Sequence, residues 1–381
     1  MRTPIRPGLP YRAQASTEDG VIGSSTAAVR VDRSDEPPVL WFPRADVDLD
    51  GLAPGAWRAG EGDLAGYVAF DQDLVELVLV DAGRGDAGQD TTTRFPNWGD
   101  AADLIELLDV RPEGDGRYHG KAHSDWRRPV VEGSQILGEA IVAASRHAPG
   151  RRVVSASMLF TRAADARVPH AIELDVVSGG RTFSAVGVRA TQGGRTCAAG
   201  SLLLDVTADT VIRHAVARPE VAGPYESTPF DMSVTGRDLR IVDDAYTGDP
   251  DAPLGPPVLD AWVRFREVPD DQPIHAALLA QFTGHLSIAA AMRPHPGIGQ
   301  DQAHRTLSTA VNAISLSIHA DVRADRWMLY HHRSTFAGDG MTHAVCRVHD
   351  ETGALVASFS VDAMVRDFAD PAQGADPRTA L

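Results

Sequence analysis

Two polar residues on predicted apolar helices, His285 and Glu139, are the best candidates for proton-transfer chemistry. His285 shares one predicted helical face with Leu278, Phe282 and Ala289, because these residues follow helical spacing. Apolar surroundings would favour the neutral imidazole, which can act as a general base near pH 7. A core histidine bonded to a backbone carbonyl is the alternative interpretation.

Glu139 lies in a predicted helix over residues 133–145, beside a stripe of small and branched apolar side chains. Its carboxylate would face either a pocket, where it could shuttle a proton, or solvent, where it would be hydrated or paired. We therefore expect His285 first and Glu139 second as catalytic groups.

The sequence predicts neither a metal site nor a cofactor. Cys197 and Cys346 are isolated in the chain, so they form no zinc-binding motif. His331 and His332 adjoin on one predicted strand, where neighbouring side chains point to opposite faces and cannot chelate one ion together.

Length and composition predict a globular chain of two or three domains. The chain has 381 residues, of which 43% are hydrophobic and 23% charged. Its formal net charge of −16 would repel phosphate backbones and anionic lipids, so neither a nucleic acid nor a membrane surface is an expected partner. Arg127 and Arg128 could still contact a CoA phosphate or a carrier phosphopantetheine, with surface salt bridges as the alternative.

The location expected from the sequence is cytoplasmic. Two isolated cysteines suit a reducing compartment, and the first 30 residues hold no apolar run of secretory-signal length. No stretch approaches the ~18 continuous apolar residues of a membrane-spanning helix.

The elements that would position these groups occur twice along the chain. Each copy reads as one helix, near residues 133–145 and 275–292, followed by several extended stretches. Phe160 matches Ile318 and Asp205 matches Asp362, at offsets of 157 to 159 residues. A lone copy leaves an apolar face open, so the two copies should share one continuous antiparallel sheet around two helices, in the α+β class.

The predicted organisation has five main parts, with one short linker between the first two. An N-terminal arm, irregular over residues 1–37, leads into a small acidic β-rich module that ends by residue 90. A linker rich in Gly, Asp and Thr follows, at residues 82–98. The remaining boundaries are a first unit over 95–205, a linker over 206–258, a second unit over 259–366 and a tail over 367–381.

Several segments in this order resemble the double-hotdog acyl-CoA thioesterases of the type II, TesB-like family. That resemblance implies a double-hotdog fold, hydrolysis of acyl-CoA thioesters and an acyl chain lying along the hotdog helix. The N-terminal residues 41–52 and 62–81 resemble parts of a small all-β domain of unknown function. The family-like segments are GSQILGEAIVAA (133–144), which looks like a Gly-Gly-Gln helix start, SGGRTFSAVGVRATQGGR (178–195), VPDDQPIHAALLAQFTG (268–284), MRPHPGIGQDQAHRTLSTA (292–310) and ALVASFSVDAMVR (354–366).

The resemblance also implies a water-holding site made of an Asp, a Thr or Ser and a Gln. Those positions fall on Gly284, Val311 and Val361, none of which can take or give a proton. These three residues should line a drier pocket, together with Gln135 and Phe282 as further substrate-binding candidates. Asn312 follows Val311 and should lie on the opposite face of the strand, as a strand-edge polar residue or a pocket group.

Three functional hypotheses follow from this combination. The first is a recruited biosynthetic enzyme that performs elimination, isomerisation or cyclisation on an acyl or polyketide-like substrate, linked to CoA or to a carrier. The second is a non-catalytic acyl-binding or partner protein. The third is a thioesterase with a different water-activating set. A homo-oligomer is left open.

Overall fold

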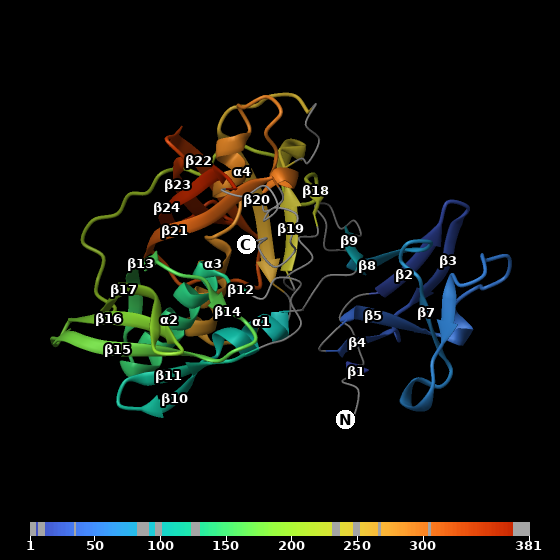
Figure 1. Ribbon diagram of the computed structural model, residues 1–381, viewed down its shortest axis with the longest axis horizontal. Coiled ribbons are helices and arrows are strands. Elements are labelled where there is room, and N and C mark those ends of the chain that lie inside the picture. Colours follow the sequence, from blue (N-terminus) through green and yellow to red (C-terminus); the bar gives the residue numbers. More distant parts are fainter. Residues whose placement is uncertain are drawn as a thin grey trace.

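The computed structural model describes residues 5–368, apart from 7–11, 34–35, 82–90, 96–100, 123–129, 231–236, 247–251, 266–267 and 304–305. Its largest part is a 13-stranded antiparallel sheet wrapped around central helices (Figure 1). The helices are α2 (Gly133–His147), α3 (Gln272–Phe282) and α4 (Ser287–Met292), with α1 (Ala101–Leu108) packed beside α2 and α3. This arrangement confirms the double hotdog expected from the sequence.

The sheet runs from the first unit into the second without a gap, because β13 pairs with β21. The first-unit strands, in spatial order, are β10 (Arg111–Gly114), β11 (Arg117–Gly120), β15 (His170–Gly179), β16 (Phe183–Gln192), β17 (Arg195–Asp205) and β13 (Arg152–Phe160). The second-unit strands are β21 (Leu307–Ile318), β24 (Leu355–Asp367), β23 (Met341–Asp350), β22 (Met328–Gly338), β20 (Val258–Phe265), β19 (Arg237–Ile241) and β18 (Thr228–Pro229).

The joint between the units is a symmetric point of the duplication. Ser157 of β13 lies opposite Ser315 of β21, and the Ser157 hydroxyl donates to the Ser315 hydroxyl at 3.1 Å. These two residues are 158 apart, within the repeat offset found in the sequence. Equivalent residues that face each other mark the position of a local two-fold relation between the units.

The helices approach each other closely because α2 carries a glycine at the contact. A Cβ atom on Gly138 would lie 2.9 Å from the Ala277 carbonyl oxygen and 2.8 Å from Leu108. Leu137 and Ile141 of α2 are fully buried. Among the described residues, Gln272–Met292 is long and apolar enough to cross a membrane, but 78% of its most apolar window is buried inside the protein. It therefore packs as a core segment of the hotdog.

The predicted second helix over 275–292 is wrong in its middle, where the structure has a break between α3 and α4. Thr283 caps α3 and α4 begins at Ser287. Leu286, between them, has a φ of 67°, a left-handed conformation that interrupts a helix. The apolar sequence pattern continues through the break, so helical spacing could not reveal it.

The N-terminal residues form two small sheets beside the large one (Figure 1). Their core includes Leu40, Phe42 and Phe95. The expectation of an irregular arm over residues 1–37 is therefore wrong where these residues form strands. The linker expected over 82–98 is wrong at 91–95, which pairs with β8. The strands are β1 (Ile5–Arg6), β4 (Val29–Arg33), β5 (Glu36–Pro43), β7 (Tyr67–Phe70) and β6 (Trp57–Ala59) in one sheet, and β3 (Gly20–Ser25), β2 (Arg12–Thr17), β8 (Glu76–Asp81) and β9 (Thr91–Phe95) in the other.

Candidate active site at the start of helix α2

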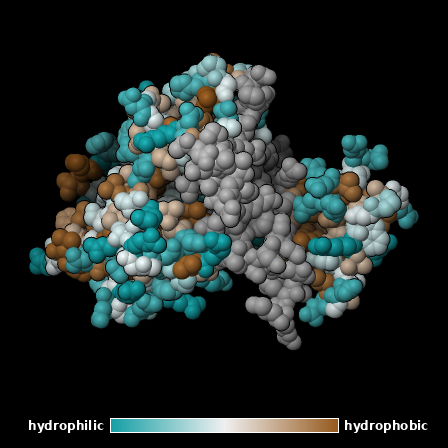
Figure 2. Space-filling view, viewed as in Figure 1, coloured by the Kyte–Doolittle hydropathy of each residue, from teal (hydrophilic) through white to brown (hydrophobic). Residues whose placement is uncertain are grey.

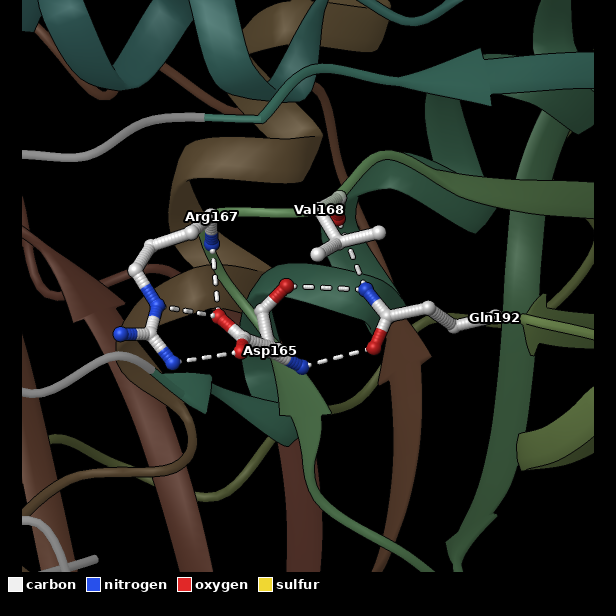
Figure 3. Close-up of polar contacts among 4 residues, drawn as sticks. All are labelled: Asp165, Arg167, Val168 and Gln192. Atoms are coloured by element: carbon white, nitrogen blue, oxygen red, sulfur yellow. Dashed lines mark hydrogen bonds and ion pairs between the residues drawn. The ribbon is translucent and has the colours of Figure 1, made fainter.

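The start of α2 is held in place by a short strand pair and a glutamine clamp. β12 (Val130–Val131) precedes α2 and pairs with β14 (Ala164–Asp165). The Gln192 amide accepts a hydrogen bond from the Asp165 backbone N–H at 2.8 Å and donates to the carbonyls of Asp165 and Val168 at 2.8 and 2.7 Å (Figure 3). Gln192, within a family-like segment, therefore fixes the loop that orients the helix start.

Ser134, in the first turn of α2, packs against Gly284 in the break between α3 and α4. A Cβ atom on Gly284 would overlap the Ser134 hydroxyl and lie 2.9 Å from Ser134 Cβ. Ser134 is only 3% exposed, so its side chain fills this space. The position where the resemblance implies an Asp therefore has no room for a side chain. The only sign of this in the sequence is the serine that stands at the second position of the Gly-Gly-Gln-like helix start.

His285 lies in the break after α3 and not on a helix, so its predicted place on an apolar helical face is wrong. Its Nε2 atom is 3.3 Å from Glu132 Oε2, and Glu132 is the N-cap residue of α2. The same nitrogen is 3.4 Å from the Gln281 amide nitrogen and 3.4 Å from an Arg237 guanidinium nitrogen. The imidazole therefore has polar neighbours at Nε2, while the centre of its ring lies 5.1 Å from that of the Phe282 ring.

These side chains form one network that joins both units. Gln281 donates to Glu132 Oε2 at 2.9 Å and accepts from Arg237 at 3.1 Å. The Arg237 guanidinium also lies 4.6 Å from the centre of the Phe282 ring, which is fully buried and packs on Tyr330. Nε2 of His285 thus meets a carboxylate that stabilises the protonated ring and two donors that can bond the neutral ring. This is an arrangement in which the imidazole can exchange a proton.

Asn312 was expected to point away from Val311, but a β-bulge changes the alternation. Asn312 is an extra residue of β21 relative to β24. Thr309 and Ile314 are an odd number of residues apart, yet both are buried. Strand alternation counted forward from Thr309 puts Val311 on the buried face, and alternation counted back from Ile314 puts Asn312 there as well. The side-chain amide oxygen of Asn312 is buried without a hydrogen bond to any described residue. Val361 of β24 is 1% exposed and pairs with Ile314.

Glu139 faces neither a pocket nor solvent, and it is fully buried beside a histidine that our sequence analysis did not identify. His170 Nε2 lies 2.5 Å from Glu139 Oε2, and the Gln135 amide donates to Glu139 Oε1 at 2.9 Å. Burial disfavours the imidazolium, but the Glu139 charge and its hydrogen bond outweigh that effect and raise the pKa of His170. Within the described residues, His170 Nδ1 and Gln135 Oε1 are buried and have no hydrogen-bond partner.

The remaining candidates do not join this site. His331 bonds Asp260 and His332 bonds the Leu259 carbonyl, and burial lowers the pKa of His332 to about 4. Across the part of the chain that the structure describes, no cluster of His, Cys, Asp and Glu could hold a metal ion. Residues 127–128 lie outside the described residues. A polar cavity of about 400 Å³ lies over β11, β15 and β16, and its lining includes none of the side chains around His285.

Comparison with known families covers both units. A family model for the acyl-CoA thioesterase N-terminal domain matches residues 122–204, and one for the acyl-CoA thioesterase C-terminal domain matches residues 214–364. Together the two models match more than half of the chain.

Individual known proteins are also similar to this chain over most of its length. Acyl-coenzyme A thioesterase 8 of Mus musculus is 23% identical over 75% of this chain and 93% of its own length. Acyl-CoA thioesterase 2 of Haemophilus influenzae is 24% identical over 69% of this chain and 96% of its own. The solved structure of the acyl-CoA thioesterase II TesB2 from Mycobacterium marinum shares the fold, with a TM-score of 0.59 and 24% identity, covering 70% of this chain and 99% of that one.

Proposed function

The chain belongs to the type II, double-hotdog acyl-CoA thioesterase family, and from this premise we propose that it acts on an acyl or polyketide-like thioester by chemistry other than the family's attack of held water. The substrate would be linked to CoA or to a carrier phosphopantetheine. Elimination, isomerisation and cyclisation are the reactions that such a site can catalyse by moving a proton.

One observation carries this proposal: the contact between Ser134 and Gly284. The resemblance implies a carboxylate at position 284, and the hydroxyl of Ser134 takes the space that its Cβ would need. Val311 and Val361, at the other two implied positions, carry no polar atom on their side chains. Loss of one such group typically costs on the order of 10²–10³ in rate, so the loss of all three argues against the inherited mechanism.

His285 is the group we assign to proton transfer. Its contact with Glu132 would hold the imidazolium that forms when the ring takes a proton, and Gln281 and Arg237 would orient it. Glu139, our second candidate, is bonded to both His170 and Gln135, which favours a positioning role over proton exchange with a substrate.

The test is a pair of measurements on the purified protein and on two variants. Binding of octanoyl-CoA and of CoA is measured by calorimetry, and product formation is followed by mass spectrometry with acyl and β-hydroxyacyl thioesters. His285→Gln should leave octanoyl-CoA binding within a few-fold and lower turnover by about 10²-fold or more. His319→Gln, an exposed histidine bonded to Ser358, is the matched control and should change neither quantity.

The outcomes separate the alternatives. Binding without any product would support a non-catalytic acyl-binding protein, and hydrolysis that survives His285→Gln would support a different water-activating set. A protein that binds neither ligand would refute the proposal.

A further inference from the structure

We propose that the site selects acyl chains that carry a hydroxyl group, and that Gln135 and His170 recognise this hydroxyl. The inference rests on the proposed function and narrows its substrate class to hydroxyacyl thioesters. It comes from a buried cluster of three side chains in the first unit, His170, Glu139 and Gln135, in which two polar atoms lack a partner among the described residues.

Gln135 presents an acceptor to a ligand and not a donor. It is fully buried, and its Nε2 atom donates to Glu139 Oε1 at 2.9 Å. An ionised carboxylate only accepts hydrogen bonds, so the amide nitrogen must face Glu139 and the amide oxygen must face away from it. That oxygen, Oε1, is buried and has no partner in the described part of the chain. A ligand that completes it must supply an O–H or N–H group.

His170 holds the same carboxylate from the other side. Its Nε2 atom lies 2.5 Å from Glu139 Oε2. Burial lowers the pKa of His170, but the charge of Glu139 and its hydrogen bond outweigh that effect and raise it. The protonated ring carries a hydrogen on each nitrogen, so Nδ1, which is also buried without a described partner, is a free donor. Gly120 lies opposite His170 in the sheet, where a Cβ atom would overlap the imidazole.

An acceptor and a donor on the two sides of one carboxylate define the ligand group. A plain alkyl chain satisfies neither Gln135 Oε1 nor His170 Nδ1, a ketone satisfies only His170, and an ammonium satisfies only Gln135. A hydroxyl can donate to Gln135 and accept from His170. Because buried polar atoms without a partner are costly, a chain that supplies this group should bind more tightly than one that lacks it.

The cluster lies close to the proton-transfer group along α2. Gln135 is three residues after Glu132, whose carboxylate is 3.3 Å from His285 Nε2, and four residues before Glu139. These spacings put the three side chains along one face of the helix. Three residues of helix span about 4.5 Å. A thioester that reacts at His285 would therefore bring a substituent on its β-carbon beside Gln135.

The test compares the binding of octanoyl-CoA with that of each enantiomer of 3-hydroxyoctanoyl-CoA, by calorimetry on the full-length protein. One enantiomer should bind about 10-fold more tightly than octanoyl-CoA, because its hydroxyl completes the two buried atoms. 8-Hydroxyoctanoyl-CoA, with its hydroxyl at the far end of the chain, should show no such gain. Gln135→Leu should remove the preference and leave octanoyl-CoA binding within a few-fold. 

Gln272→Leu is the matched control. Gln272 also lies in the first turn of a central helix, but both polar atoms of its amide bond the backbone of Val322. Its loss leaves the atoms of Gln135 and His170 as they are, so Gln272→Leu should keep the preference.

A second variant keeps the inference testable if Gln135→Leu does not fold, which melting temperatures report. Glu139→Gln replaces a group that only accepts with one that also donates, so the Gln135 amide is no longer held in one orientation. The preference for the hydroxyacyl compound should fall in Glu139→Gln, while octanoyl-CoA binding stays within a few-fold.

The outcomes separate this inference from the proposed function. Equal affinity for octanoyl-CoA and both 3-hydroxyoctanoyl-CoA enantiomers would overturn the hydroxyl selection and leave the proposed function standing, with water completing the two buried atoms. A preference that survives in folded Gln135→Leu, or that is unchanged in Glu139→Gln, would also overturn it. A protein that binds none of these thioesters would refute the proposed function itself.

Discussion

At the scale of single residues, Ser134 and Gly284 share one small space between two helices. The resemblance implies the reverse distribution, a glycine on α2 and an acid after α3, and the serine hydroxyl now stands where the acid would begin. The nearby side chains that can carry a charge are His285, one position further along the chain, and Glu132, which contacts His285 from the other unit. These two residues together therefore leave no room for the acid that the resemblance implies.

Adding a side chain at position 284 should destabilise the protein. Gly284→Ala should lower the free energy of unfolding by about 1–3 kcal/mol, because its Cβ overlaps Ser134. Adding Ser134→Gly to the same protein should recover most of that loss. Chemical denaturation measures both, with Gly187→Ala as the control, since a Cβ there has ordinary contacts of 3.6 Å or more. Equal losses in the single and double variants would contradict the proposed contact.

The buried pair of His170 and Glu139 should make stability depend on pH. The pKa of His170 is raised in the folded protein, so its stabilising effect is complete below about pH 6.5 and fades as the pH rises through the raised value. The stability advantage of the unaltered protein over His170→Gln should therefore shrink from pH 6 to pH 9. The same comparison in a Glu139→Gln background should show little pH dependence. An advantage that grows with pH would reverse our assignment of the charges.

At the scale of elements, the sequence pattern predicted the repeats but not their interruptions. Apolar spacing located α2, and the offset between copies predicted the shared sheet. The break at Leu286 could not be predicted, because a leucine fits the apolar pattern whether its backbone is helical or left-handed. The bulge at Asn312 could not be predicted, because strict alternation assumes that each residue of β21 pairs with one residue of β24. Both interruptions lie among the candidate site residues. The sequence could therefore indicate which residues are candidates, but not which side chains each of them contacts.

His170 shows a further limit of sequence reasoning. It opens β15 and is separated by 31 residues from Glu139, so no local pattern links the two. Arg237 and Glu132 are likewise brought to His285 only by tertiary packing.

The glutamine clamp of Figure 3 should support both the fold and the site. Gln192→Ala removes three hydrogen bonds to the loop of residues 165–168 and should cost roughly 1–3 kcal/mol of stability. Because that loop pairs with the strand before α2, hydrogen exchange at the start of α2 should also quicken. Thr191→Ala, a neighbour on the same strand with one long 3.4 Å contact to Glu173, is the control. Unchanged melting and unchanged hydrogen exchange in Gln192→Ala would refute this role.

At the scale of the whole molecule, the two units share one sheet and one core. β13 and β21 join the sheet, and α2 meets α3 at Gly138. Hydrophobic side chains reach the surface at the β15–β16 end (Figure 2), where Val176, Val177 and Phe183 are about half exposed or more. The shared core predicts that a perturbation in one unit reaches the other.

Gly138→Ala tests that coupling, because its Cβ would press on Ala277 of the second unit. Hydrogen exchange should quicken in α3 and β22 as well as in α2, together with a lower melting temperature. Gly187→Ala should leave exchange in the second unit unchanged. Faster exchange confined to the first unit would show that the halves unfold independently.

The central claim, that the site no longer performs the inherited hydrolysis, is tested most directly by free-thiol release from short, medium and long acyl-CoAs. The protein should release thiol far more slowly than the ~10 s⁻¹ typical of enzymes, while still binding the same compounds. Any slow release that remains should fall further in His285→Gln. Turnover near ~10 s⁻¹ would contradict the account, whether or not His285→Gln lowers it.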